Sequence, residues 1–522
     1  CGVQSNCISI QPLETDFGRK RKIDQSSCNK DFSCANGFCP SFVTVLGGKI
    51  RKASVMRSKN MSPKSEEIPE PIFPILPESG SYGLIVTGVG GTGVVTIGAM
   101  LGMAAHIQKL GVSIVDQLGF AQKGGAVVTH VRLSKDQDQI HASRVNNGMA
   151  DAILACDMLV AGSNKVLDSL NPGKTRAVIN TAKNYTGDFT LNSDLDYPTD
   201  ILISRLKACT RSNDTKMFNA SQIAIKLLGD TLGANLLLTG FAWQSGLIPI
   251  KEAPILEAIK LNGVAVDWNK EAFAWGRRLA HQPELIEQIM NPDNTTKPLL
   301  FTPNSTADWV AKYSKELTLY QNQAYAERYQ TLVTKVVQTE TKAMLKNTGL
   351  ATVVAKAAFK LMAYKDEYEV ARLYSEPEFL EKLEAQFEGD YRLQFNLSPP
   401  IIAPKDKNTG KPDKIQIGAW ILTVFGLLAK FKFLRGTKID PFGYLSDRKI
   451  ERDLIEQYFD TIELLIKGIN SDNYELAVEI AAIPMSIRGY GHIKHESVLE
   501  ARQENGILLK KWYDVTQENI AV

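Results

Sequence analysis

Five of the seven cysteines in this chain lie within the first 39 residues, where their thiolates could bind a metal. Their spacing is C-x5-C-x20-C-x5-C-x4-C-P. Thiolates are soft, charged ligands that select zinc or iron–sulfur clusters. The closing Cys-Pro is typical of cluster motifs, whereas the paired short spacings of zinc knuckles are mostly missing. The pattern favours a cluster, with structural zinc or inert thiols as alternatives, at Cys1, Cys7, Cys28, Cys34 and Cys39.

A glycine loop forms the second candidate site, with glycines at positions 88, 90, 91 and 93. It lies between an apolar segment, 82–87, and a predicted helix at 94–110, so backbone N–H groups could meet an anion there. Asp116 follows the next predicted strand, about where a nicotinamide-binding fold carries its ribose-binding acid. A nucleotide-binding dehydrogenase is therefore one alternative. The other is that the glycines only permit a tight turn and close helix–sheet packing.

Residues 488–494 read RGYGHIK and place cationic groups around two glycines. Such a pattern is typical of an ordered loop that touches something anionic. A purely structural turn is the alternative.

The elements that must position these residues change along the chain. Residues 1–49 have too few apolar side chains for a core, so a metal centre would have to stabilise them. Prolines mark 50–81 as a linker. In 82–269, helices alternate with predicted strands, which predicts an α/β domain with a parallel sheet. Residues 270–522 are predicted to be mostly α-helical. The strands are expected at 82–87, 112–115, 126–133, 158–161 and 177–180, and a buried helix at 225–246.

Composition sets limits on function. The chain has 522 residues, 44% hydrophobic and 22% charged, with a net charge of +3. This is the balance of a soluble globular protein and gives no reason to expect nucleic acid or membrane as partner. No segment predicts a bilayer span or signal peptide, so we expect a cytoplasmic protein. Because the sequence begins with Cys1 and not Met, we expect a fragment.

The cysteine region resembles a known family. Residues 1–7 (CGVQSNC), 11–21, 24–30 and 37–43 are similar to the iron–sulfur segment of fused bacterial indolepyruvate:ferredoxin oxidoreductases. In that family a C-x2-C-x2-C run lies just upstream, and its last member would match Cys1. The resemblance implies 4Fe-4S clusters, with some ligands outside the present sequence.

Residues 88–98, 117–125 and 130–134 resemble the gamma domain of the same family. That domain is Rossmann-like, is not an NAD enzyme, and helps form the substrate or coenzyme A side of the active site. Lys123 would lie in an exposed loop and meet a carboxylate or phosphate; a solvated surface lysine is the alternative. The implied site residues are Gly88, Gly90, Gly91, Thr92, Gly93, Gln122, Lys123, Gly124 and Gly125.

One expected motif of the family is missing. Thiamine-diphosphate enzymes hold the magnesium–diphosphate through Gly-Asp-Gly, but Gly229-Asp230 continues to Thr231 and Gly389-Asp390 to Tyr391. The resemblance therefore places thiamine diphosphate and Mg²⁺ in the upstream remainder of the polypeptide. It implies oxidative decarboxylation of an aryl 2-oxoacid to an acyl-coenzyme A, with ferredoxin as acceptor, in a homo-oligomer. The fragment should be inactive alone, no catalytic residue is assigned, and a zinc-stabilised assembly module remains an alternative.

Overall fold

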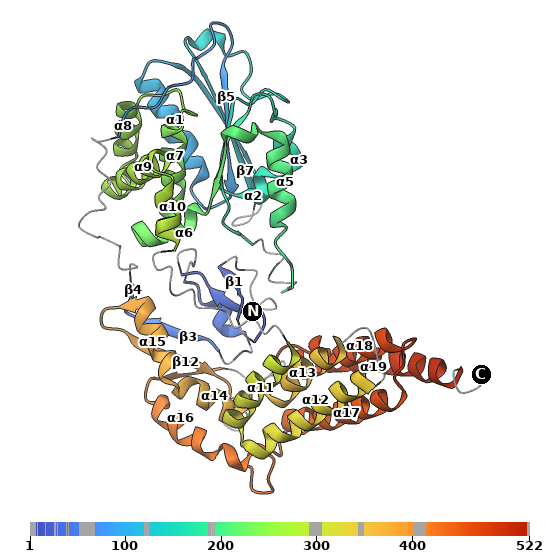
Figure 1. The fold of residues 1–522 in the computed structure, drawn as a ribbon. Coiled ribbons are helices and arrows are strands. Elements are labelled where there is room, and N and C mark those ends of the chain that lie inside the picture. Colours follow the sequence, from blue (N-terminus) through green and yellow to red (C-terminus); the bar gives the residue numbers. More distant parts are fainter. Residues whose placement is uncertain are drawn as a thin grey trace, which may run out of the picture. The chain divides into compact units, whose positions relative to one another are not determined.

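The computed structural model describes residues 7, 9–15, 17–25, 28, 30–37, 39, 41–51, 68–119, 125–185, 189, 192, 194–291, 305–342, 349–399 and 414–518. The chain divides into two compact units (Figure 1). The first unit combines Cys1–Asp31 with Ile50–Leu299, and the second combines Phe32–Lys49 with Leu300–Val522.

The first unit is built on a six-stranded sheet with the order β10-β9-β8-β5-β7-β6. Strand β5 is central because its apolar sequence YGLIVTGV is buried over nearly its whole length. Strands β5, β8, β9 and β10 are parallel, whereas β7 runs antiparallel to both β5 and β6. The predicted α/β class with a largely parallel sheet is confirmed. The strands are β5 (Tyr82–Val89), β6 (Gly111–Leu118), β7 (Ala126–Ser134), β8 (Ala152–Ala155), β9 (Arg176–Asn180) and β10 (Thr215–Phe218).

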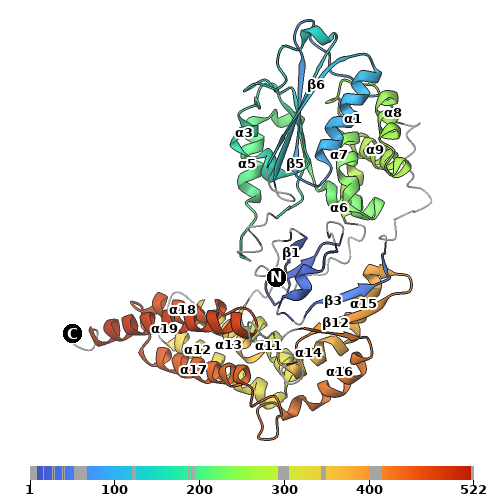
Figure 2. The ribbon, with the colours of Figure 1, turned by 180° about the vertical axis from the view of Figure 1, so that it is seen from behind.

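Helices cover both faces of this sheet (Figures 1 and 2). Alternate residues of a strand point to opposite faces, so Leu84 and Val86 pack under one helical layer and Ile85 under the other. The first layer contains α1 (Val94–Ile107), α6 (Ala220–Leu228), α7 (Ala234–Gln244), α8 (Glu252–Asn262), α9 (Val266–His281) and α10 (Glu284–Met290). The second contains α2 (Met158–Ala161), α3 (Asn164–Leu167) and α5 (Thr199–Cys209).

Two sequence predictions are wrong in detail. Residues 158–161 form helix α2 and not a strand, because the Asp157 carboxylate accepts a hydrogen bond from the backbone N–H of Val160 at 3.0 Å and caps the helix. The single helix predicted at 225–246 is interrupted by Gly229, whose φ of 82° ends α6.

The remaining described parts of the first unit are short. Strands β1 (Ile10–Leu13) and β2 (Lys20–Ile23) form an antiparallel hairpin within residues 1–49, the segment predicted to lack a core of its own. In the described part of the predicted linker, the Phe73 ring packs edge-on against Trp243 at 5.7 Å between centroids.

The second unit is mostly helical, as predicted, with one small sheet that the sequence did not reveal. Strand β12 lies between β3 and β13 and is antiparallel to both. Helices α14 and α16 cover this sheet and share a core with it. These elements are β3 (Val43–Leu46), β12 (Arg392–Leu397), β13 (Ile415–Gly418), α14 (Glu367–Ser375), α15 (Pro377–Gln386) and α16 (Ile421–Lys430); β4 (Lys49–Ile50) and β11 (Phe387–Glu388) are two-residue strands.

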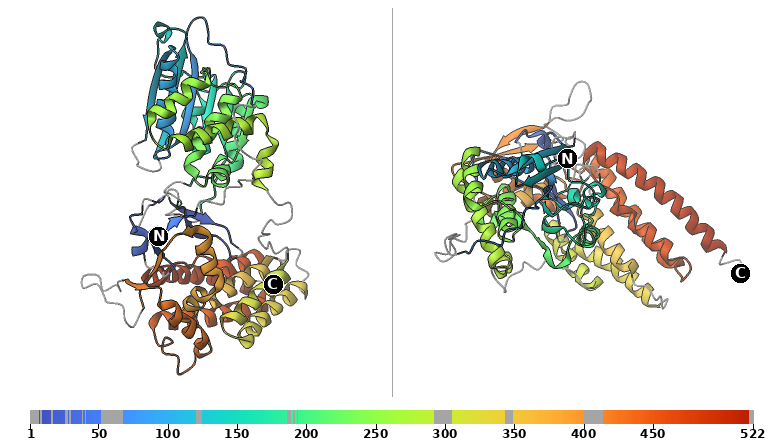
Figure 3. Two further views of the ribbon diagram at one scale, coloured as in Figure 1. Left: turned by 90° about the vertical axis from the view of Figure 1, so that its left-hand side faces the viewer. Right: turned by 90° about the horizontal axis from the view of Figure 1, so that it is seen from above.

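A larger helical bundle completes the second unit (Figure 3). Its helices share one apolar core. They are α11 (Thr306–Tyr320), α12 (Gln323–Lys342), α13 (Gly349–Met362), α17 (Ser446–Gly468), α18 (Tyr474–Ala482) and α19 (Gly491–Glu518). Among the described residues, no helix combines the length and the apolar character needed to cross a lipid bilayer.

Candidate functional site

The glycine loop forms a tight turn between β5 and α1. Gly91 and Gly93 have φ values of 84° and 88°, in the left-handed region that favours glycine. The backbone N–H of Gly90 donates to the carbonyl of Gly125 at 2.8 Å, and the Thr92 hydroxyl donates to the carbonyl of Val89 at 2.7 Å. The loop is therefore stabilised by one hydrogen bond to Gly125 and one within the loop itself.

Other glycines of this region serve close packing. A Cβ atom on Gly88 would lie 2.4 Å from Cγ2 of Val94, and one on Gly98 would lie 2.5 Å from Cγ2 of Thr129. Both distances are too short for any real Cβ, so α1 can approach β5 and β7 only because these residues are glycine. The packing interpretation of the motif therefore holds for Gly88, and Gly98 within α1 serves the same purpose.

The start of α1 keeps its backbone donors accessible. Gly93 caps the helix without a side-chain hydrogen bond, and the first turn carries no acidic residue. Gly91, Thr92 and Gly93 are exposed. Since the first N–H groups of a helix have no partner within it, this end can accept an anionic group. The Asn235 amide donates to the carbonyl of Thr92 at 2.7 Å and ties the loop to α7.

Of the residues predicted to lie beside the glycine loop, the structure describes only one. Gly125 lies next to Gly90 through the hydrogen bond given above. Gln122, Lys123 and Gly124 lie outside the described residues.

Asp116 does not take the position that a dinucleotide-binding unit requires. Its strand, β6, is separated from β5 by β7, whereas the acidic residue of that fold lies on the strand next to the first. The Asp116 carboxylate instead accepts a hydrogen bond from the Thr129 hydroxyl on β7. The geometry therefore gives no support to the nucleotide-binding alternative.

The predicted cysteine ligands are divided between the two units. Cys7 and Cys28 belong to the first unit and Cys34 and Cys39 to the second, while Cys1 lies outside the described residues. All four described cysteines are partly exposed, and none is in a disulfide. Across the described ranges, no three cysteine, histidine or acidic side chains are grouped closely enough to hold a metal ion.

Two of these sulfur atoms accept backbone hydrogen bonds. The N–H of Lys30 donates to Sγ of Cys28, and the N–H of Ser41 donates to Sγ of Cys39, both at 3.4 Å. Each donor lies two residues after its cysteine. Hydrogen bonds to sulfur are one of the means by which proteins stabilise thiolate ligands and tune clusters. By contrast, Cys156 is buried, and burial raises the pKa of its thiol to about 12, which suits a structural thiol.

Lys414 lies beside Cys39 although 375 residues separate them in the sequence. Its Nζ donates to the Cys39 carbonyl at 2.7 Å and lies 5.5 Å from the centroid of the Phe42 ring. Burial lowers the pKa of Lys414, and the negative charges of Cys39 and Cys34 oppose that shift. No local pattern in the sequence marks this lysine, because only the pairing of β3, β12 and β13 brings it to the cysteines.

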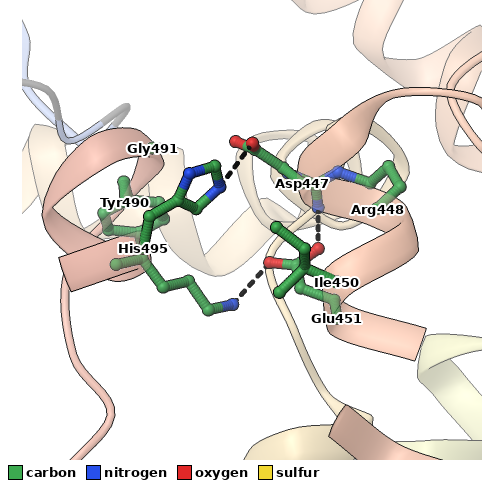
Figure 4. A pocket seen from close by; sticks show the side chains of 8 residues that line it. Asp447, Arg448, Ile450, Glu451, Tyr490, Gly491 and His495 are labelled. Carbon is green, nitrogen blue, oxygen red and sulfur yellow. Dashed lines mark hydrogen bonds and ion pairs between the residues drawn. The ribbon is translucent and has the colours of Figure 1, made fainter. Parts of the chain in front are cut away.

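A small cavity lies where α17 and α19 begin (Figure 4). Its volume of about 20 Å³ is enough for one water molecule. The Lys494 ammonium donates to Glu451, and His495 Nε2 lies 2.9 Å from Oδ1 of Asp447. The cavity is lined by Asp447, Arg448, Ile450, Glu451, Tyr490, Gly491, Lys494 and His495.

Part of the cationic pattern at 488–494 lies at this cavity. Gly489 and Gly491 have positive φ values; Gly489 lies in the turn before α19 and Gly491 is its first residue. Arg448 also contacts the Glu451 carboxylate, at 2.7 Å. Burial raises the pKa of Glu451, whereas the charges of Arg448 and Lys494 lower it. Of the cationic residues in 488–494, Lys494 therefore meets a carboxylate of α17 in the same chain.

Comparisons with known proteins cover two parts of the chain. Residues 83–279 match the family described as pyruvate ferredoxin/flavodoxin oxidoreductase, and 306–506 match a family of unknown function, DUF6537. Indolepyruvate oxidoreductase subunit IorB of Methanothermobacter thermautotrophicus is 27% identical over 198 residues, which covers 38% of this chain and 96% of that protein. The subunit of the same name from Pyrococcus horikoshii is 28% identical over 204 residues, with 38% and 96% covered.

Among solved structures, pyruvate oxidoreductase subunit PORC from Thermotoga maritima is 18% identical, with a TM-score of 0.28. The match covers 38% of this chain and 97% of that chain. The family match and the two relatives confirm the predicted resemblance to a gamma-type domain for residues 83–279.

Proposed function

We propose, from the match of residues 83–279 to the pyruvate ferredoxin/flavodoxin oxidoreductase family and to the indolepyruvate oxidoreductase subunits, that the chain is the C-terminal part of a thiamine-diphosphate-dependent indolepyruvate:ferredoxin oxidoreductase. In this proposal the first unit forms the coenzyme A side of the active site, and clusters bound by the cysteines within the first 39 residues carry electrons. The observation that carries the proposal is the family match over the domain that contains the exposed glycine loop.

The proposed coenzyme A side is the loop before α1. The proposed residues are Gly88, Gly90, Gly91, Thr92 and Gly93. Gly91, Thr92 and Gly93 are exposed at the start of α1, where no side chain caps the helix, whereas Gly88 is buried and the Gly90 N–H is bonded to Gly125, so these two shape the turn. These donors suit a phosphate of coenzyme A or the carboxylate of a 2-oxoacid. Gln122, Lys123, Gly124 and Gly125 are proposed to complete the site. Thiamine diphosphate and Mg²⁺ are assigned to another part of the protein, because no Gly-Asp-Gly motif occurs here.

The proposed electron-transfer site uses Cys1, Cys7, Cys28, Cys34 and Cys39 as thiolate ligands of 4Fe-4S clusters. Such clusters accept and release single electrons when bound. The residues of this chain would hold the ligands: Lys30 and Ser41 donate N–H groups to sulfur, and the Lys414 ammonium offsets thiolate charge near Cys39. The donor chemistry and these hydrogen bonds support the assignment.

Anaerobic reconstitution with iron and sulfide tests the cluster assignment. We expect a brown protein that contains iron and acid-labile sulfide and gives an electron paramagnetic resonance signal after reduction. Cys34→Ser and Cys39→Ser should lose most of the iron and the signal, whereas Cys209→Ser, which removes another partly exposed thiol, should retain them. A colourless protein that takes up zinc would instead identify a zinc-stabilised assembly module.

A further inference from the structure

Helix α16 carries an apolar stripe on its solvent side. Trp420, Val424, Leu427 and Phe431 are all exposed, with 66% exposure for Trp420 and 59% for Leu427. Their spacing of four, three and four residues places them on one face of the helix. We name these four residues the α16 outer face.

The opposite face of α16 packs the helix into the second unit. Ile421 and Phe425 are buried in the core that α16 shares with α14 and β12. The outer face is therefore not needed to fold the second unit. Trp, Phe and Leu side chains exposed together are typical of a binding surface and not of ordinary protein surface.

The chain segment that carries the α16 outer face is basic. Residues 415–439 contain three lysines and one arginine but no aspartate or glutamate. Arg435 is buried in an ion pair with Asp366, and Lys432 donates to the carbonyl of Leu319. Lys430 and Lys438 remain exposed. An apolar centre with a basic rim complements a partner whose surface is apolar in the middle and acidic at the edge.

The buried side of α16 leads toward Cys39. The Phe425 ring stacks on Tyr374 at 5.6 Å between centroids, and Tyr374 contacts Phe395 at 5.1 Å. Phe395 is the cross-strand partner of Val43, four residues after Cys39. An α-helix is about 10 Å across, so a protein on the outer face would lie about one helix diameter from this aromatic cluster.

We propose that the α16 outer face is the docking surface for a small acidic electron-carrier protein that accepts electrons from the centre held by Cys34 and Cys39. The proposal rests on the electron-transfer function proposed above and adds the place where electrons leave. Cys34 and Cys39 would hold the electron-donating centre, which, when bound, would give one electron to the oxidised carrier; the centre would be oxidised by one electron, the carrier reduced by one, and no covalent bond would form or break. Proximity to Cys39 favours a redox protein over a lipid surface as the occupant.

Binding of a two-cluster bacterial ferredoxin to the reconstituted full chain, measured by titration calorimetry, tests this proposal. Leu427→Asp places a charge in the centre of the apolar face and should weaken binding by about tenfold or more. The matched control is Leu261→Asp on α8, because Leu261 is 60% exposed and also lies on a helix. The control should bind ferredoxin like the unchanged chain.

Salt dependence provides the second measurement. Lys430→Glu and Lys438→Glu should slow association and flatten its dependence on ionic strength. Lys207→Glu, which reverses an exposed lysine on α5, should leave both unchanged. The proposal would be overturned if Leu427→Asp and Leu261→Asp weakened ferredoxin binding equally. It would also be overturned if Lys430→Glu and Lys438→Glu changed the association rate no more than Lys207→Glu does.

Two other outcomes would also overturn the docking proposal. In the first, Leu427→Asp abolishes dimerisation of the chain but leaves ferredoxin binding unchanged. In the second, it abolishes adsorption of the chain to anionic phosphatidylserine vesicles but leaves ferredoxin binding unchanged. Iron content separates this proposal from the one on which it rests. A brown Leu427→Asp protein with full iron and weakened ferredoxin binding supports docking. A brown protein with unchanged binding refutes docking alone, whereas a colourless wild-type chain refutes the cluster.

Discussion

His130 is a buried histidine on β7 whose ring the fold keeps neutral. Only 5% of the residue is exposed, and its Nδ1 accepts a hydrogen bond from the backbone N–H of Val145 at 3.3 Å. Burial lowers the pKa of His130, and the positive charges of Arg144 and Lys165 lower it further. A proton on Nδ1 would also remove the acceptor that Val145 uses.

This environment predicts a pH-dependent stability. The ordinary histidine pKa is about 6.5, so below that pH the unfolded chain binds a proton that the folded chain resists. The His130 contribution is therefore complete above about pH 6.5 and is lost as the pH falls toward the lower folded pKa. His130→Asn keeps an oxygen for Val145 but cannot titrate there, so its free energy of unfolding should fall less between about pH 7 and pH 5. Urea unfolding at several pH values checks this; parallel curves for both proteins would contradict it.

Single residues also explain where sequence-based prediction succeeded and failed. The glycines at 91 and 93 predicted a turn and helix start, because their positive φ values are a local property. The short apolar run at 158–161 was mistaken for a strand because its pattern does not distinguish a strand from a helix. The Asp157 cap decides the matter. Lys414 could not be predicted, since its contact with Cys39 depends on distant strands pairing.

Helices α7 and α9 meet through two glycines, one on each helix. A Cβ on Gly240 would lie 2.0 Å from the Phe273 carbonyl oxygen, and one on Gly276 would lie 1.9 Å from the Leu237 carbonyl oxygen. Both obstructions are backbone atoms, which cannot move aside as the end of a flexible side chain can. The sequence predicted a buried interface helix in this region but not the partner helix.

Gly276→Ala should therefore destabilise the first unit. A methyl group there forces the two backbones apart, and overpacking of this kind costs about 1–3 kcal/mol or more. The control is Gly506→Ala in α19, where nothing lies within 4 Å of the added Cβ. That change should stabilise by about 0.5–1 kcal/mol, because alanine favours the helix. Thermal unfolding of both variants compares the two effects; a Gly276→Ala protein as stable as the parent would show that the helices can separate at no cost.

Strand order was the element-scale property that the sequence predicted least well. The 82–87, 94–110 and 112–115 segments predicted two strands of a parallel sheet, and β5 and β6 do run in the same direction. However, β7 lies between them and is antiparallel to both. The pattern of apolar residues in a strand indicates which of its faces is buried but not which strands lie beside it. The position of β7 in the sheet could therefore not be predicted from its sequence.

On the scale of the whole molecule, each unit has its own apolar cores. The β5–β10 sheet and its helices contain one pair of cores, and the helical bundle and the small sheet contain another. Composition predicted a helical region after residue 270, but the small sheet takes β3 from residues 43–46 and pairs it with β12 from 392–397. Pairing over such a sequence separation leaves no local pattern.

Separate cores predict separate unfolding transitions, and one buried ion pair can identify the second. Arg435 and Asp366 are 4% and 3% exposed, and two guanidinium nitrogens contact the carboxylate at 2.6 and 2.8 Å. Arg435→Met leaves the Asp366 charge buried without its partner, which costs about 3–5 kcal/mol. Calorimetry of the full chain should show two transitions, with Arg435→Met lowering one and Gly276→Ala lowering the other. A single transition that both substitutions shift equally would mean that the two units unfold as one cooperative body.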